Sequence, residues 1–341
     1  MRSFCSDNNS GVHPLIMKAI TDANTDHAVG YGDDKWTDAA VAKIRENFGD
    51  CEPLFVFNGT GSNVIALQCM TRTYQTIFCA ETGHIFVDEC GAPARFTGCS
   101  VRAIPTADGK LTPGMIEPYL TGIGEEHHSQ PGAIYISQCT ELGTIYTPQE
   151  LKKLTTFAHK HGMKVHMDGA RISNAAASLG KSLKEVSKDG GIDTLTLGGT
   201  KNGLMMGECI LIFNEELKAE AKFYRKQAAQ LASKMRYLSC QFTAYLTDGL
   251  WKTCADNANK KSFKFADALK LYKGISFTQK IESNQLFLTM PKKAAEAMLK
   301  KYHFYIMKEL GSDCEIRLVC SWDTTDEDID AFLVDLSKVM K

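Results

Sequence analysis

One lysine, Lys201, lies among glycines and uncharged residues in the stretch LTLGGTKNGLMMGE, directly after an apolar run. Lysine is strongly hydrated and rarely leaves water without a partner or a function. Two interpretations fit this position: a capped turn on the surface, or an amine held in a pocket for chemistry. The lysine alone favours the surface turn, so the rest of the sequence has to decide.

Two further polar residues follow strand-like runs. Asp168 closes the run KVHMDGAR, and a buried aspartate requires a cation or hydrogen-bond donors. An ion pair with Arg171, or a helix N-cap, explains Asp168 as well as a catalytic role does. His84, in ETGHIFVDECGAP, is either a structural histidine or a flat ring on which a planar cofactor could stack.

A glycine-bearing loop opens a helix in FNGTGSNVIALQ. Backbone N–H groups at such a helix start, from Gly59 to Ser62, suit a phosphate. The loop is neither a P-loop nor a G-x-G-x-x-G fingerprint. Its glycines can also be explained by the steric needs of a strand-to-helix junction.

The surrounding pattern predicts the elements that position these groups. From about residue 53, short apolar runs alternate with amphipathic stretches, which indicates βαβ units and a mostly parallel sheet. After Glu215 long helices and a few strands predict a small α+β domain. We expect an N-terminal arm and a large α/β domain over residues 1–245 and a small domain over residues 246–341. Ligands of open α/β sheets bind beyond the carboxyl ends of the strands, where the groups named above should meet.

Composition excludes several classes of protein. The 341 residues are 44% hydrophobic and 23% charged with a net charge of -1, which is typical of a globular protein and shows no basic block for nucleic acid. The 12 cysteines include no C-x-x-C pair and no histidine at ligand spacing, so we expect reduced thiols, a cytoplasmic location and no metal site. The stretch MRSFCSDNNSGVHP lacks the apolar h-region of a signal peptide, and no run reaches the ~18 apolar residues of a membrane span, so no membrane association is expected.

An anion cradle, a carboxylate, a flat ring and an amine at one sheet edge together match the needs of pyridoxal 5'-phosphate (PLP). This cofactor requires a phosphate site, a carboxylate for its pyridine nitrogen, a stacking face and a lysine for the imine. The combination is far less expected by chance than any single part, and it reverses the preference for a surface turn at Lys201.

The sequence also resembles a known family. The motifs FNGTGSN, ETGHIFVDECGAP, HMDGARISNA, GGTKNG, KQAAQLASKMRYLS and RLVCSWDT are similar to those of low-specificity threonine aldolases, a branch of the PLP-dependent β-eliminating lyases and aldolases. The similarity extends from SDNNSG to CSWDT, which is nearly the whole chain. It implies the PLP-dependent transferase-like fold type I, with active sites shared between subunits of a homodimer or homotetramer.

The resemblance also implies which residues bind the cofactor. Lys201 would form the imine, Asp168 would pair with the pyridinium nitrogen, and Arg171 would lie near the phenolic oxygen. His84 would stack on the ring. The remaining cofactor-binding positions are Gly59, Thr60, Gly61, Ser62, Thr200, Lys226 and Arg236. Of these, Lys226 and Arg236 lie on helical stretches where a solvated charge is the default, and we expect them to act across a subunit interface.

Substrate contacts follow from the same resemblance. Arg317 matches the arginine that anchors the substrate carboxylate, for which a bidentate fork is suited, and Ser6 would assist it. Tyr31 matches a substrate-side aromatic residue, although simple packing also explains it. Many threonine aldolases have a histidine where this chain has Glu141, so the group that accepts the hydroxyl proton stays open between Glu141, His84 and a water molecule.

The implied reaction is retro-aldol cleavage of L-threonine or L-allo-threonine to glycine and acetaldehyde, with Lys201, His84 and Glu141 as catalytic residues. An alternative keeps PLP but performs β-elimination, racemisation or transamination of another amino acid. A more remote alternative is a non-catalytic α/β small-molecule binding protein with Lys201 on a surface turn. The preferred side chain and the stereochemistry at Cβ stay open.

Overall fold

The computed structural model describes residues 2–340. Within that range a seven-stranded sheet forms the centre of the large domain, in the order β1-β7-β6-β5-β4-β2-β3. Its strands are β1 (Glu52–Val56), β2 (Gln75–Ala80), β3 (Ser100–Ile104), β4 (Gln130–Ser137), β5 (Lys164–Gly169), β6 (Thr194–Gly198) and β7 (Glu208–Ile212). Neighbouring strands pair in parallel except that β7 is antiparallel to both β1 and β6. This arrangement confirms the predicted mostly parallel sheet.

Both faces of this sheet are buried, which explains the continuous apolar runs in the sequence. In β4, Ile134 and Ile136 belong to the hydrophobic core on one face, whereas Ala133 and Tyr135 belong to the core on the other. Because successive side chains of a strand point to opposite faces, each run supplies both cores.

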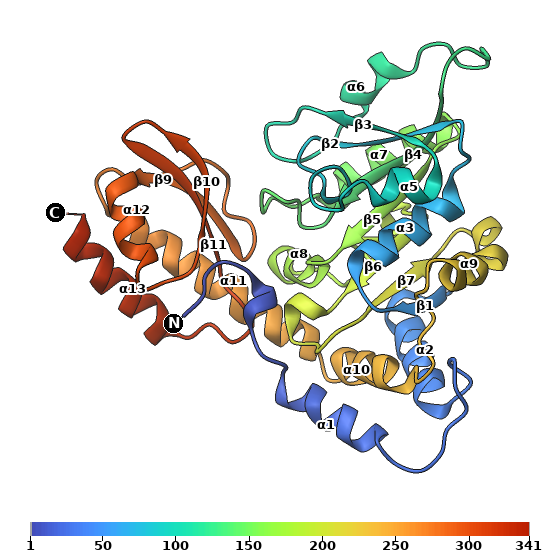
Figure 1. The fold of residues 1–341 in the computed structure, drawn as a ribbon, viewed down its shortest axis with the longest axis horizontal. Helices are drawn as coiled ribbons and strands as arrows, with labels where there is room; N and C mark the ends of the chain where they lie inside the picture. Colours follow the sequence, from blue (N-terminus) through green and yellow to red (C-terminus); the bar gives the residue numbers. More distant parts are fainter. Residues whose placement is uncertain (1, 341) are drawn as a thin grey trace.

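Helices cover the two faces of the sheet (Figure 1). Side chains of α2, α7, α8 and α10 pack in one core, and side chains of α3 and α9 pack in the other. The large-domain helices are α1 (Pro14–Ala23), α2 (Lys35–Phe48), α3 (Gly59–Met70), α4 (His84–Val87), α5 (Ala92–Thr97), α6 (Pro113–Ile116), α7 (Pro148–Lys160), α8 (Ile172–Leu179), α9 (Glu215–Gln227) and α10 (Arg236–Leu246). Short 3-10 turns are η1 (Asp7–Asn9), η2 (Glu117–Tyr119), η3 (Lys188–Gly190) and η4 (Thr200–Asn202).

Local sequence signals set several helix starts. Thr147 and Glu150 form a capping box at the start of α7, and Pro148 occupies the first turn where its missing N–H is not needed. Asn58 caps α3 by accepting a hydrogen bond from the Gly61 N–H group at 2.8 Å. These caps fix where the loops at the carboxyl ends of the strands end.

A second, antiparallel sheet forms the small domain. It has the order β10-β11-β9-β8 and consists of β8 (Ser276–Phe277), β9 (Gln285–Pro291), β10 (Tyr305–Leu310) and β11 (Asp313–Val319). Helices α11 (Leu250–Leu269), α12 (Lys292–Leu299) and α13 (Asp326–Val339) accompany it. These elements form the separate α+β unit that the C-terminal sequence pattern predicts.

The N-terminal segment packs on the small domain, next to which Figure 1 places the N-terminus. Phe4 is fully buried in the small-domain core, its N–H group donates to the carbonyl of His303, and its carbonyl accepts from Val319. The domain boundary at residue 245 stays a prediction. The N-terminal segment also contributes a side chain, Phe4, to the core of the small domain.

No helix within residues 2–340 is long and apolar enough to cross a membrane. All 12 cysteines are free thiols, and all but Cys90 are buried.

Candidate active site

The strand-end residues meet at one edge of the large sheet. Asp168 ends β5, Lys201 lies in η4 after β6, His84 begins α4 after β2, and Glu141 lies in the loop after β4. A cavity of about 680 Å³ opens at this edge between the two domains. The residues that line it include Ser6, His84, Glu141, Arg171, Lys201 and Arg317.

Glycines around Lys201 allow the tight packing that directs its amine into the cavity. A Cβ atom at Gly198 would lie 2.5 Å from the Cα atom of Ala170, and Gly203 has φ of +105°. Burial and then the positive charge of Arg171 lower the pKa of Lys201, against the opposing effects of Asp7 and Asp168. A lowered pKa increases the neutral fraction of the amine, which is the nucleophilic form.

Asp168 is held by donors from three elements. Its Oδ2 atom accepts from the Asn63 amide and the Tyr135 hydroxyl, both at 2.9 Å, and its Oδ1 atom accepts from the N–H group of Ala170 at 2.9 Å. Burial alone would raise the pKa of Asp168, but the positive charge of Lys201 and the Asn63 hydrogen bond outweigh it and lower the pKa. The side chain therefore stays a carboxylate at neutral pH.

His84 lies next to a second buried carboxylate. Its Nδ1 atom is 2.8 Å from Glu89 Oε1, and the same oxygen accepts from the Asn63 amide at 2.8 Å. This hydrogen bond raises the pKa of His84, against the effect of burial. We refer to the connected side chains as the pocket cluster, which consists of Asn63, His84, Glu89, Glu141 and Asp168.

The Glu141 side chain contacts the backbone of the same histidine. Its Oε1 atom accepts from the His84 N–H group at 2.8 Å and from the Ser137 hydroxyl at 2.7 Å. Both hydrogen bonds use Oε1, so Oε2 is available to a ligand in the cavity. Burial raises the pKa of Glu141, against these hydrogen bonds. A carboxylate with a raised pKa is a stronger base than an exposed one.

The two arginines of the cavity differ in their partners. Arg171 forms a bidentate ion pair with Asp7, with N···O distances of 2.7 and 2.9 Å. Arg317 has no carboxylate within ion-pair distance among residues 2–340; it donates to the Cys5 carbonyl at 3.2 Å and lies 5.2 Å from the centre of the Tyr305 ring. Its Nε atom is buried and meets no hydrogen-bond partner in the described part of the chain. Arg317 is therefore the guanidinium open to an anionic ligand.

The start of α3 offers two backbone donors for a phosphate. Among the described residues, the N–H groups of Gly59 and Thr60 meet no acceptor, whereas Gly61 donates to its cap Asn58. The Ser62 hydroxyl is buried and lies 2.7 Å from Thr196 Oγ1. A Cβ atom at Gly59 would meet nothing within 4 Å, so space is open beside Gly59, whereas the Gln230 side chain lies against Gly61. With the lysine, the carboxylate and the histidine, this cradle fits PLP.

The remaining expected site residues lie outside the cavity lining. Tyr31 is 55% exposed and its ring is 5.5 Å from Lys226 Nζ. Arg236 donates to the carbonyls of Thr25 and Asp26 at 2.8 and 3.3 Å. Thr200 precedes Lys201 and donates to the Gly207 carbonyl at 3.3 Å. Their roles toward a cofactor or substrate stay predictions.

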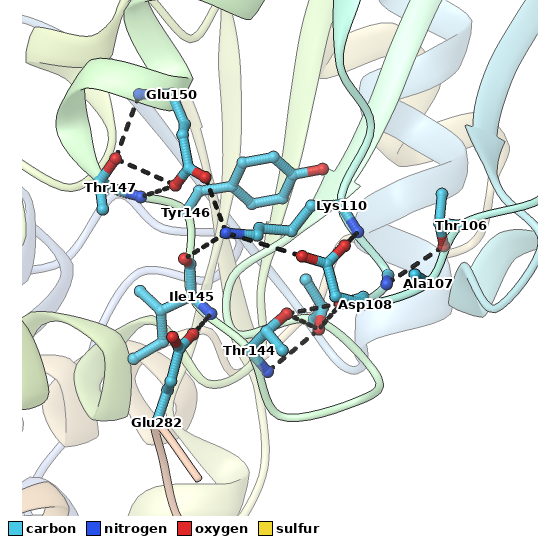
Figure 2. Close-up of polar contacts among 12 residues, drawn as sticks. Thr106, Ala107, Asp108, Lys110, Thr144, Ile145, Tyr146, Thr147, Glu150 and Glu282 are labelled. Atoms are coloured by element: carbon cyan, nitrogen blue, oxygen red, sulfur yellow. Dashed lines mark hydrogen bonds and ion pairs between the residues drawn. The ribbon is translucent and has the colours of Figure 1, made fainter. Parts of the chain in front are cut away.

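A second polar cluster supports the loop that carries Glu141 (Figure 2). Lys110 Nζ lies 2.8 Å from Glu150 Oε1, 3.9 Å from Asp108 Oδ2 and 3.4 Å from the Ile145 carbonyl oxygen. The Ile145 N–H group donates to Glu282 Oε2 of the small domain at 2.8 Å. We refer to Asp108, Lys110, Thr144, Glu150 and Glu282 as the Lys110 cluster.

Several residues of the site were not expected from the sequence. They are Asp7, Asn63, Glu89, Tyr135 and Ser137. Asn63 lies within the FNGTGSN motif and Asp7 within SDNNSG, so both were close to recognised signals. Tyr135 interrupts an apolar strand with one hydroxyl, a pattern that ordinary packing also produces.

Comparison with known proteins agrees with this geometry. Residues 3–291 match the β-eliminating lyase family. The chain is 40% identical to the low specificity L-threonine aldolase of Pseudomonas aeruginosa, over 99% of this chain and 98% of that one. It is 24% identical to the enzyme of the same name from Saccharomyces cerevisiae, over 92% and 80% of the two chains. The solved structure of Leishmania major threonine aldolase superposes with a TM-score of 0.95 at 31% identity, with 100% of both chains covered.

Proposed function

The chain belongs to the β-eliminating lyase family, and we propose that it is a PLP-dependent carbon-carbon lyase that cleaves L-threonine and related β-hydroxy-α-amino acids to glycine and an aldehyde. The observation that carries this proposal is the convergence on one cavity of Lys201, His84 and Arg317, the last of which has no carboxylate partner among residues 2–340. Asp168 lies directly behind this lining, close enough to His84 and Lys201 to interact with their charges. An α/β protein that only bound a ligand would not need a lysine with a lowered pKa there.

Each cofactor-binding group has a role that follows from its position. PLP, when bound, supplies an electron sink for the pair released at the substrate Cα atom. Lys201 supplies the amine that attaches the cofactor. The carboxylate of Asp168 would keep a proton on the ring nitrogen, His84 would offer a ring to stack against the cofactor, and the N–H groups of Gly59 and Thr60 would donate to the phosphate.

The substrate is held and deprotonated by the other side of the cavity. Arg317 binds the substrate carboxylate, and Ser6 is available beside it. Glu141 Oε2 takes the proton of the β-hydroxyl group, so that the O–H electrons form the aldehyde carbonyl while the Cα–Cβ bond breaks. A proton returned to Cα yields glycine. The buried position of Glu141 beside His84 supports its assignment as this base.

Self-association is part of the proposal. Lys226, Arg236 and Tyr31 lie away from the cavity of their own chain, where a partner subunit's site could use them. Exposed apolar side chains occur near them, including Phe57, Met205 and Met206. We propose a homodimer or homotetramer with shared sites, which light scattering after size-exclusion chromatography would measure.

We also propose a cytoplasmic location. The absence of a disulfide among the 12 cysteines supports a reducing compartment. Cell fractionation with detection of the full chain would test this.

A glycine-release assay tests the function. Purified protein is supplied with PLP and then with L-threonine, L-allo-threonine or phenylserine in parallel. The proposal expects glycine from at least one of the three, in amounts equal to the aldehyde. Release from none of them would contradict it.

A further inference from the structure

A buried carboxylate below the cavity, Glu89, has no role in the steps described above. Its side chain is fully buried, and its Oε1 atom contacts both the Asn63 amide and His84 Nδ1 at 2.8 Å. The contact atoms of His84, Glu89 and Asp168 all lie within 4.8 Å of one another. Two carboxylates this close repel each other unless donors separate them, so their placement requires an explanation.

One amide group separates the two carboxylates. Asn63 Nδ2 donates to Glu89 at 2.8 Å and to Asp168 at 2.9 Å. The orientation of this amide is fixed, because Asn63 Oδ1 lies 2.9 Å from His166 Nε2 and 3.1 Å from Thr196 Oγ1. Burial lowers the pKa of His166 to about 4, so this histidine is neutral and can donate through Nε2.

The backbone after α4 turns Glu89 inward. Cys90, directly after it, has φ of +51°, a left-handed conformation that non-glycine residues rarely adopt, and Gly91 continues with φ of +73°. The Ala92 N–H group closes the turn on the Glu89 carbonyl at 2.8 Å. Strained residues persist where the surrounding structure determines them, often at functional sites.

The contact with Glu89 decides which nitrogen of His84 faces the cavity. A carboxylate only accepts hydrogen bonds, so Nδ1 must carry the proton, and Nε2 is left for the cavity that His84 lines. Four charged side chains act on His84: Glu89 beside the ring, Asp168 on β5, Lys201 on η4, and Glu141, which accepts from the His84 backbone N–H group. Asp88, the C-cap of the same helix, also lines the cavity.

We propose that Glu89 is a positioning residue that fixes the His84 ring with Nδ1–H toward Glu89 and Nε2 toward the cavity. Through the Asn63 amide, which both carboxylates share, Glu89 also fixes the position of Asp168 relative to that ring. The consequence for the enzyme rests on the proposed function, because it assumes that both side chains serve the cofactor. The geometry of His84 itself does not depend on that function.

The test measures the protonation of His84 in the full-length protein. Diethylpyrocarbonate reacts with the neutral form of imidazole and not with the protonated form, and peptide mass spectrometry reports the rate at each histidine across a pH series. In the wild type, the midpoint for His84 is expected to lie above 6.5, the ordinary pKa of histidine, since the Glu89 hydrogen bond raises the pKa of His84. A midpoint at or below 6.5 would overturn the proposal without any variant.

Variants then isolate Glu89. Glu89→Gln keeps the shape and an acceptor oxygen but removes the charge, so modification of His84 at pH 6 should become roughly tenfold faster. Glu89→Asp keeps the charge and should stay closer to the wild-type rate. Glu150→Gln, which removes a carboxylate of the Lys110 cluster, should leave the rate unchanged. A folded Glu89→Gln protein with the wild-type rate at His84 would refute the proposal.

A kinetic readout separates this proposal from the proposed function. Glu89→Gln should lower kcat for threonine while KM changes less than twofold, because the carboxylate anchor Arg317 is untouched. If no variant or wild-type protein cleaves threonine, the proposed function fails, yet the His84 profile still decides the role of Glu89. If cleavage occurs and the profile is unchanged, only the positioning role fails.

Discussion

In the Lys110 cluster an ammonium group has a carboxylate 2.8 Å away. In the pocket cluster three carboxylates lie around one histidine, and two of them, Glu89 and Asp168, share the Asn63 amide. Both clusters draw on the loop of residues 138–147. The Lys110 cluster pairs its charges and joins the loop to the small domain. Within residues 2–340, Glu89 Oε2 of the pocket cluster has no hydrogen-bond partner, and Arg317 Nε has none either.

The difference separates two uses of polar side chains. Charges that meet opposite charges locally hold a loop in place, and they are satisfied before any ligand arrives. Charged groups that line a cavity without an ion-pair partner lower the stability of the free protein. They can bind a ligand that supplies the missing opposite charge or hydrogen bond. Loss of a cavity residue that lacks an opposite charge, such as Arg317, should therefore reduce activity more than stability. Loss of a residue whose charge is paired, as in the Lys110 cluster, should affect stability more than activity.

The largest effect is expected for Lys201→Ala. Removal of the amine should abolish the visible absorbance of the lysine-bound cofactor and lower kcat by about 10³-fold or more. Absorbance spectra and a threonine assay check both outcomes. A variant that retained the band and the turnover would show that another group attaches the cofactor.

Glu141→Gln tests the base. Because burial raises the pKa of Glu141 and a base acts only when deprotonated, wild-type activity should fall as the pH decreases through that pKa. The amide should lower kcat about 100-fold and remove this acid limb from the pH profile. If the limb persisted unchanged in the variant, His84 or a water molecule would have to be the base.

The two cavity arginines provide a matched pair. Arg317→Ala should raise KM for threonine roughly 10- to 100-fold, because a charged hydrogen-bond anchor is lost, with little change in melting temperature. Arg171→Ala leaves Asp7 buried without its cation and should destabilise the fold by about 3 kcal/mol or more. Kinetics and thermal unfolding of both variants compare them directly; equal losses of stability would contradict the distinction.

The stability that the Arg171–Asp7 ion pair contributes should decrease at low pH. Burial alone would raise the pKa of Asp7, but the charge and hydrogen bonds of Arg171 outweigh it and lower the pKa. The stability that this pair contributes is therefore present above the unfolded-state pKa and is lost as the pH falls through the folded-state value. Urea unfolding should show a smaller difference between wild type and Arg171→Ala at pH 3 than at pH 7.

The smallest effect is expected for Lys110→Met. The ion pair with Glu150 is partly exposed, with side-chain exposures of 16% and 43%, so its loss should cost no more than about 1 kcal/mol after solvent screening. Turnover of threonine should stay within twofold of the wild type, since no Lys110-cluster residue lines the cavity. A tenfold loss of turnover with intact stability would mean that this cluster takes part in catalysis.

The fold and part of the site could be predicted from the sequence. Short apolar runs bounded by turn residues identify the strands. Because ligands of open α/β sheets bind beyond the carboxyl ends of the strands, the sequence alone predicts that Lys201, Asp168 and His84 lie at one edge of the sheet. Arg317 required the family resemblance, because β11 belongs to the other domain and no local pattern links it to the large sheet.

The hydrogen-bond and ion-pair partners of these residues could not be predicted from the sequence. Asp7 meets Arg171 across 164 positions of sequence, and Asn63 meets Asp168 across 105. Such pairs arise from tertiary packing, which periodicity does not encode. The orientation of Glu89 depends on a left-handed residue at Cys90, and a non-glycine side chain gives no sign of that conformation.

Product identification tests the central claim most directly. Purified protein with PLP is incubated with L-threonine, and acetaldehyde, glycine, ammonia and 2-oxo acid are quantified from the same reaction. The account predicts acetaldehyde and glycine in a one-to-one ratio, with neither product formed by Lys201→Ala. Ammonia with a 2-oxo acid, or racemised threonine without acetaldehyde, would contradict carbon-carbon bond cleavage at this site.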